Sequence, residues 1–300
     1  MAAFARTLTA ALGGTVLDLM RAPGGTSRRF WTFDLEREGR RLPLVALQDV
    51  GRGPLFGTRF DMGREARMLR ALGRAGAAVP AVHHRDAAGG FMVLDRLPGR
   101  ADFTFDDEAQ RLAVIADFGR VLAALHRLDA GALDDLPIAP LPATRTQATL
   151  ADIADYEDAY LRLCARHALV DDAFAWAKAH VPRDDAPPVV LQGDAGPTNF
   201  MHQDGHVVGL IDWEMAHAGD PHDDLAWIWF RVAMLGFDRD VAPWFRAYVR
   251  AAAMMIDEER LRYFIVLVTL RCTVANLVDA RGGGPRALPP LGLDGKEAGS

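Results

Sequence analysis

Cysteine, lysine and long apolar runs are scarce in this 300-residue sequence, and each scarcity excludes a class of protein. The only cysteines, Cys164 and Cys272, lie in helix-like stretches, so the chain is no disulfide scaffold and suits a reducing compartment. The most apolar run, Phe264 to Leu270, ends at Arg271 and is shorter than the roughly 18 residues of a membrane span. Residues 1–14 form only a weak apolar run with no cleavage site after it, which predicts no signal peptide and a cytoplasmic protein.

A basic excess is also missing. The sequence has 34 Lys and Arg against 40 Asp and Glu, a net charge of −6, which argues against binding to nucleic acid or an anionic membrane. Nearly all the basic residues are arginines, because Lys178 and Lys296 are the only lysines. No repeat of 20–50 residues is present. Half of the residues are hydrophobic and a quarter are charged, which is typical of a folded globular protein of about two domains.

The first 97 residues predict a small β-rich lobe with one helix. Two strand-like runs flank a Gly24-Gly25 turn, and Trp31, Phe33 and Leu35 alternate after it. The segment from Asp61 to Gly76 has the apolar spacing of a helix. Further strands are predicted at Pro43–Leu47, Val79–His84 and Phe91–Leu97.

Beyond Pro98-Gly99 the pattern becomes mostly helical and predicts a larger lobe over residues 98–281. Helices are predicted at 107–128, 156–167 and from Leu225 to about Ala280, with strands at Val189–Leu191 and Val207–Ile211 between them. Residues 282–300 are rich in Gly and Pro and predict a flexible tail. The expected fold class is therefore α+β with two lobes.

The strongest chemical signal comes from acidic and amide side chains that follow the two later strands. Asp194 enters a Gly/Pro loop, Asn199 follows five positions later, and Asp212 thirteen positions after that, at the end of the next strand. A hairpin can bring these three side chains together. Carboxylate and amide oxygens suit a hard cation such as Mg²⁺, and the remaining Asp can orient a hydroxyl group and accept its proton. Protein kinases have the same Asp-to-Asn interval in their catalytic loop.

These motifs resemble those of the aminoglycoside phosphotransferase and choline-kinase-like enzymes, and the resemblance extends to about residue 280. GGTSRRFWTFDL is similar to the phosphate-covering hairpin, REARMLRAL to the N-lobe helix and FMVLDRLPG to the hinge. LQGDAGPTNF and GLIDWEMAHAGDPHDDLAW are similar to the catalytic and metal loops, and are the most specific matches. The QGD and IDWE versions most resemble kinase domains related to those fused to acyl-CoA dehydrogenases. The resemblance implies a bilobal, protein-kinase-like small-molecule kinase that uses ATP or GTP with Mg²⁺.

The resemblance also implies roles for individual residues. Asp194 would be the catalytic base, and Asn199 and Asp212 would hold Mg²⁺. Glu65 would be the carboxylate of the N-lobe helix, on the same face as Leu69 and Leu72. Main-chain amides around Gly24, Gly25, Thr26 and Ser27 would cover the phosphates, and Asp95 lies in the hinge-like segment. Arg28 and Gln48 are further candidates for nucleotide binding. The acceptor would be a hydroxyl group of a small molecule.

Two positions depart from the family pattern. Gln192 stands where the family usually has His, and we expect it to act as a scaffold hydrogen-bonding residue. The third strand should end in Lys or Arg, but Leu47 and Gln48 occupy the candidate positions. Because Glu65 lies on an apolar stripe, something must compensate its charge. An Arg of the hairpin is the favoured candidate (Arg28 or Arg29), before a hydrogen bond from Gln48 or a helix that turns Glu65 into water.

Other interpretations remain open on the sequence alone. The missing strand cation allows a weakly active or inactive pseudokinase, and His217, Asp220 and His222 allow a metal hydrolase. We favour helix-capping roles for the acidic residues of GDPHDDLA and a solvated helix face for Ala151–Tyr160. Glu214 is open between a supporting role and the surface. The acceptor, the choice of ATP or GTP and the oligomeric state cannot be derived from these residues.

Overall fold

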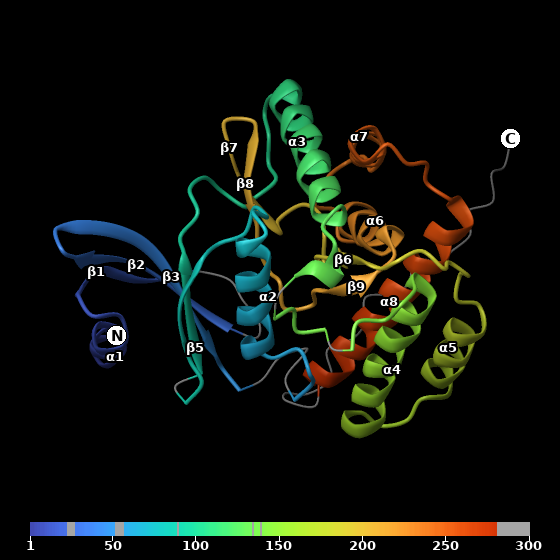
Figure 1. Cartoon of the computed structure of the whole chain (residues 1–300), viewed down its shortest axis with the longest axis horizontal. Coiled ribbons are helices and arrows are strands. Elements are labelled where there is room, and N and C mark those ends of the chain that lie inside the picture. Colours follow the sequence, from blue (N-terminus) through green and yellow to red (C-terminus); the bar gives the residue numbers. More distant parts are fainter. Residues whose placement is uncertain (23–27, 52–56, 89, 134, 139, 281–300) are drawn as a thin grey trace, which may run out of the picture.

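A computed structural model describes residues 1–22, 28–51, 57–88, 90–133, 135–138 and 140–280. A five-stranded sheet lies at the N-terminal side, and the rest of the chain is mostly helical (Figure 1). The two parts meet along helix α2 (Met62–Arg74) and the segments that follow strands β6 (Val189–Leu191) and β8 (His206–Leu210). The α+β class predicted from the sequence is confirmed. The expected tail at 282–300 lies outside the described residues.

The N-terminal sheet is antiparallel throughout, because each neighbouring pair of strands runs in opposite directions. β2 (Arg28–Arg37) and β3 (Arg40–Asp49) are joined by a tight turn in which Glu38 and Gly39 both have positive φ, as a two-residue hairpin requires. In order across the sheet the strands are β1 (Thr15–Ala22), β2 (Arg28–Arg37), β3 (Arg40–Asp49), β5 (Phe91–Asp95) and β4 (Val82–Asp86).

Helices cover both faces of this sheet. α1 (Ala2–Leu12) packs Leu8 against Phe33 and Phe91 on one face. α2 packs Leu69 and Leu72 on the other face, and the Asp61 side chain caps it by accepting a hydrogen bond from the Arg64 amide. α1 was not predicted from the sequence, because the run is short and has no side-chain cap. Its apolar contacts with the sheet stabilise it instead.

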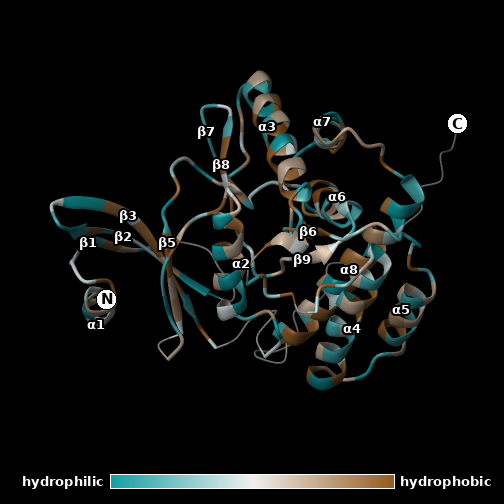
Figure 2. Cartoon of the chain, in the orientation of Figure 1, coloured by the Kyte–Doolittle hydropathy of each residue, from teal (hydrophilic) through white to brown (hydrophobic). Residues whose placement is uncertain are grey.

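The C-terminal part combines six α-helices with two short β-ribbons within the described residues, in which β6 pairs with β9 and β7 with β8. Figure 2 shows alternating hydrophobic and hydrophilic residues along α3, α4 and α5, as expected for helices with one buried face. The elements are α3 (Glu108–His126), α4 (Arg145–Leu163), α5 (Ala168–Ala179), β6 (Val189–Leu191), β7 (Phe200–Gln203), β8 (His206–Leu210), β9 (His217–Gly219), α6 (Pro221–Trp229), α7 (Ala242–Ala252) and α8 (Glu258–Ala280), with a 3₁₀ turn at Ala130–Ala132 and a π-helical turn at Phe230–Met234.

Helix α8 is long and apolar enough to cross a membrane, and it is the one such helix in the described part of the chain. Half of its most apolar stretch is buried inside the protein, where it packs against α4, α5 and α6. Its Arg271 is buried and pairs with Asp152 at 2.6 Å and with both oxygens of Asp223 at 2.6 and 2.7 Å. These contacts are those of a core helix.

The prediction of a solvated face at Ala151–Tyr160 is wrong for part of that run. Asp152 and Tyr156 are buried, because α4 packs against β9 and α8 there. Asp158 is exposed as expected. The run also lies inside a longer helix than predicted, since α4 begins after the Thr144 cap rather than at Tyr156.

Candidate active site

A cavity of about 440 Å³ lies between the N-terminal sheet, α2 and the ends of β6 and β8. Strands β2, β3 and β5 supply apolar lining residues, among them Phe30, Val45 and Leu94. The polar lining residues come from both sides of the cavity. They are Arg28, Thr32, Glu65, Asp95, Arg96, Thr198, Asn199, Asp212 and Glu214.

Asp194, Asn199 and Asp212 are brought together as the spacing predicted. Asp194 follows β6, and Asn199 ends the same loop just before β7. The Asn199 amide donates to the Asp194 carboxylate at 2.6 Å and to its carbonyl at 2.8 Å. Asp212 follows β8 with φ 62°, a left-handed conformation that Asp tolerates, and lines the cavity beside Asn199. Its charge acts on the Asp194 carboxyl group.

Arg231, on the π-helical turn, was not identified from the sequence and contacts the same group. Its Nη1 donates to both oxygens of Asp194, at 2.7 and 2.8 Å. The rest of the guanidinium donates to the Pro197 carbonyl, the Thr198 hydroxyl and Asn199 Oδ1. Burial raises the pKa of Asp194 to about 6, although Arg231 acts in the opposite direction. A carboxylate with such a pKa is ionised at neutral pH and can still accept a proton.

Buried hydrogen bonds hold the loop that carries Asp194. Gln192 donates to the carbonyls of Asn199 and Ile211, which confirms its predicted scaffold role. The fully buried Asp224 accepts hydrogen bonds from the amides of Gln192 and Gly193, and its other buried contact is His126 at 3.0 Å. At Gly193 a Cβ atom would come within 2.2 Å of a backbone oxygen and φ is 82°, so only glycine fits there.

Arg28 compensates the charge of Glu65, as the sequence predicted for one of two hairpin arginines. Its Nη1 lies 2.5 Å from Glu65 Oε2 and its Nη2 lies 3.1 Å from Glu214 Oε2. Burial acts to lower the pKa of Arg28, but the carboxylates of Glu65 and Glu214 outweigh it and the pKa is raised. Burial, followed by the charge of Asp212, raises the pKa of Glu214 to about 8. Glu214, left open above, therefore belongs to this cavity.

The other predicted nucleotide-binding residues have different positions. Gln48 is not a lining residue: Leu47 lines the cavity, and successive residues of a strand point to opposite faces. Gln48 therefore lies on the face of the sheet turned away from the cavity, which corrects the prediction that it contacts Glu65 or the nucleotide. Asp95 lines the cavity and lies 2.6 Å from His83 Nε2. The residues Gly24, Gly25, Thr26 and Ser27 lie outside the described residues.

The oxygens near Asp212 fit a hard cation. Asp212 and Glu214 offer carboxyl oxygens and Asn199 an amide oxygen, and no cysteine or histidine is among the described residues that line the cavity. In the described ranges no group of three or more His, Cys, Asp or Glu side chains is arranged to hold a metal by itself. Mg²⁺ keeps several waters and takes substrate phosphates beside one or two carboxylates, and the oxygens of Asp212 and Asn199 are of the type it prefers.

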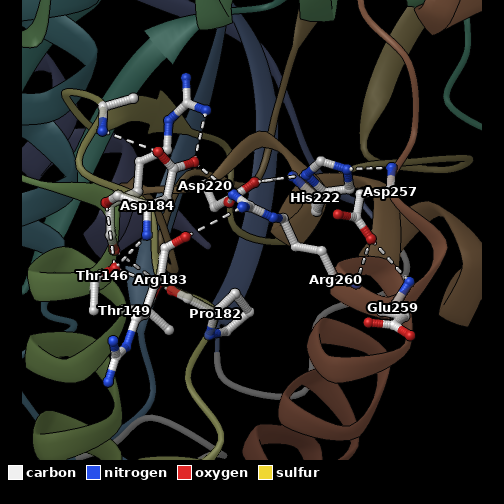
Figure 3. A network of polar contacts seen from close by, with 12 residues as sticks. Thr146, Thr149, Pro182, Arg183, Asp184, Asp220, His222, Asp257, Glu259 and Arg260 are labelled. Atoms are coloured by element: carbon white, nitrogen blue, oxygen red, sulfur yellow. Dashed lines mark hydrogen bonds and ion pairs between the residues drawn. The ribbon is translucent and has the colours of Figure 1, made fainter.

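Asp220 and His222 belong to a structural network (Figure 3). The Asp220 side chain caps α6 by accepting a hydrogen bond from the His222 amide. Arg260 joins Asp220 at 2.6 Å to Asp184 at 2.5 Å, and the Asp257 amide donates to His222. The capping role predicted for the acidic residues of GDPHDDLA is confirmed for Asp220 only, because Asp223 accepts hydrogen bonds from Arg271 and Asp224 from the amides of Gln192 and Gly193. These side chains are committed to cross-links, so this cluster gives no support to a metal hydrolase.

The chain is similar to known phosphotransferases in both sequence and structure. Residues 21–264 match the model of the phosphotransferase enzyme family. A thermostable mutant of the aminoglycoside phosphotransferase APH(4)-Ia, in a ternary complex with AMP-PNP and hygromycin B, is 20% identical with a TM-score of 0.68, covering 93% of this chain and 92% of that one. Macrolide 2′-phosphotransferase MphH from Brachybacterium faecium is 16% identical with a TM-score of 0.63, covering 94% and 93%. At these identities the two structures show a shared fold.

A mouse (Mus musculus) protein, acyl-CoA dehydrogenase family member 11, is 26% identical over 224 residues. The match covers 68% of this chain but only 28% of the mouse protein. The similarity therefore concerns one part of a much longer protein.

Proposed function

Because the chain belongs to the phosphotransferase enzyme family, we propose that it transfers the γ-phosphate of ATP or GTP to a hydroxyl group of a small molecule. The observation that carries this proposal is the hydrogen bond from Asn199 to Asp194, because Asn199 and Asp212 both line a cavity of about 440 Å³. The neighbour with AMP-PNP and hygromycin B bound supports a nucleotide and a small-molecule acceptor. The cavity volume suits a ligand of that size.

In this reaction Asp194 is the catalytic residue. The acceptor hydroxyl oxygen forms a bond to the γ-phosphorus, the bond from that phosphorus to the β–γ bridging oxygen breaks, and the hydroxyl proton passes to the Asp194 carboxylate. The pKa of about 6 suits this step, because the carboxylate is charged near neutral pH. Arg231 fixes the carboxylate through two hydrogen bonds and is a positioning residue.

Asn199 and Asp212 are the residues that would hold Mg²⁺. When bound, Mg²⁺ neutralises charge on the phosphate oxygens. Asp95 lies where the sheet leads into the rest of the chain and lines the same cavity, so we place the nucleotide base beside it. Residues 1–97 then form the nucleotide lobe and residues 98–281 the catalytic and acceptor lobe. A cytoplasmic location and a lack of nucleic-acid or membrane partners remain part of this proposal.

One observation favours a second candidate, a weakly active pseudokinase. The third strand presents Leu47 to the cavity instead of a cation, and phosphoryl transfer depends largely on charge neutralisation. Arg28 offers a charge in the same cavity, which is why we place active transfer first.

A screen of hydroxyl compounds for magnesium-dependent nucleotide consumption tests the function, with Asp194→Asn as the blank. If Asp194 is the base, this variant lowers transfer by about 10²–10⁴. Calorimetric nucleotide affinity stays close to that of the parent, because the residue acts on the acceptor. Near-parental turnover by Asp194→Asn on the identified acceptor would rule out this role. A parent that binds nucleotide but transfers phosphate to no acceptor would favour the pseudokinase.

A further inference from the structure

Arg28 is the only cation on the cavity wall, within the described ranges, that contacts both parts of the chain. Its Nη1 pairs with Glu65 on α2, and its Nη2 pairs with Glu214, two residues after Asp212. The other lining cation, Arg96, pairs with Asp34 at 2.7 Å and is more than a third exposed. Arg28 is 8% exposed and Glu65 is 2% exposed, so their contact is buried.

Strand alternation explains why Arg28, and not its neighbour, has this position. Arg28, Phe30 and Thr32 all line the cavity, so alternate residues of β2 point into it. Arg29 lies between them, is exposed, and is paired across the sheet with Gln48. On β3 the residues that line the cavity are Val45 and Leu47. The inward face of β3 therefore presents apolar side chains, and the charge comes from the start of β2.

Two carboxyl groups from separate elements meet at this guanidinium. Glu65 comes from α2 and Glu214 from the segment after β8, and each lies within ion-pair distance of a different nitrogen of Arg28. Arg28 therefore joins the two elements across the cavity. A guanidinium presents two donor branches in a fixed plane, whereas an ammonium is a single point charge. One Arg can thus hold two carboxylates from separate elements.

We propose that Arg28 is the positioning residue that fixes α2 to the segment carrying Asp212 (residues 211–216), and so sets the place of the Asp212 carboxylate before nucleotide and metal bind. The inference rests on the proposed function, because it takes Asp212 as the metal-binding carboxylate. It assigns Arg28 a role that a lysine on β3 does not fill, since the second branch of the guanidinium holds Glu214.

Calorimetry with ADP, with and without Mg²⁺, tests this role and needs no acceptor. Arg28→Ala lowers the affinity for Mg-ADP about tenfold or more and lowers metal-free ADP affinity much less. Arg28→Lys folds as the parent does and keeps the ion pair with Glu65, but its single ammonium loses the contact with Glu214. The increase in ADP affinity on adding Mg²⁺ is therefore smaller than in the parent for this variant as well. Arg29→Ala, one residue away on the opposite face, is the matched control and stays within about twofold of the parent. Equal losses with and without Mg²⁺ in both Arg28 variants would overturn the proposal.

A second variant separates this role from that of a simple phosphate-binding charge. Leu47→Lys, added to Arg28→Ala, restores an inward cation on β3. We expect it to recover affinity for metal-free ADP but not the gain from Mg²⁺, since a single ammonium does not hold both glutamates. Full recovery of the Mg²⁺ gain would contradict the proposal. A parent that shows the Mg²⁺ effects but transfers no phosphate would refute the proposed function and leave the role of Arg28 standing.

Discussion

The pair between Arg231 and Asp194 predicts a specific pH dependence. Asp194 must be ionised to accept a proton, so kcat/KM falls as the pH drops through its pKa of about 6. Arg231 holds that pKa down against the effect of burial. The Arg231→Met substitution removes the opposing charge but leaves the Asp194 carboxyl group buried. The pKa of Asp194 therefore rises, and the acid limb of the pH profile of kcat/KM moves to higher pH.

The size of the change follows from the contact. A neighbouring guanidinium lowers a carboxyl pKa by about one to three pH units, so the limb moves upward by about that amount. At pH 7 the ionised fraction then falls from about nine-tenths to between about a half and a hundredth, and kcat/KM drops roughly twofold to a hundredfold. Much of the loss is recovered at pH 9, because the base is still present and only its protonation has changed.

The assay is a profile of kcat/KM from pH 5 to 9 with the acceptor found by the screen. Arg231→Lys keeps a positive charge, and its limb stays near that of the parent. Arg239→Met is the matched control, because this exposed arginine pairs with Glu108 on the surface of the protein. An Arg231→Met profile with the parental acid limb and a uniform loss at every pH would refute the electrostatic role and leave only a packing role.

Two further variants separate metal binding from structural capping. Asp212→Ala abolishes the magnesium-dependent part of nucleotide affinity, because it removes the carboxylate beside Asn199; calorimetry that gives the parental Mg-ATP affinity would contradict this. Asp220→Ala leaves the magnesium dependence unchanged but lowers the free energy of unfolding, by about 0.5–2 kcal/mol for the lost cap and further for the lost partner of Arg260. Thermal and denaturant unfolding measure it, and unchanged stability would count against the capping role.

The sequence predicted the part of the site that depends on local chemistry. Asp194, Asn199 and Asp212 follow strands at fixed intervals, and the β7–β8 hairpin between Asn199 and Asp212 brings these residues together. The need for a cation beside Glu65 followed from its place on an apolar helix face. The choice of Arg28 over Arg29 did not follow, because it depends on which face of β2 is turned to the cavity, and the sequence pattern does not establish strand parity there.

The residues that were missed depend on long-range packing. Arg231 lies within an apolar run, AWIWFRVAML, and no local pattern indicates that it reaches a loop more than thirty positions earlier. Asp152 appeared to belong to a solvated acidic face, but Arg271 on α8 pairs with it in the interior. Helix α1 has no capping signal and owes its place to the sheet. In each case the partner is far away in the chain.

The π-helical turn at Phe230–Met234 has a consequence for how this chain can vary. An α-helix turns by about 100° per residue, and a π-turn accommodates one residue more than the α-helix would. The direction in which the Arg231 guanidinium points toward Asp194 thus depends on the number of residues in this turn as well as on the presence of arginine. Substitutions of the side chains around it leave that count intact. If one residue of the turn is deleted, the chain can keep either a continuous helix or the contact between Arg231 and Asp194, but not both. We therefore expect the contact with Asp194 to tolerate substitutions of the surrounding side chains better than a deletion.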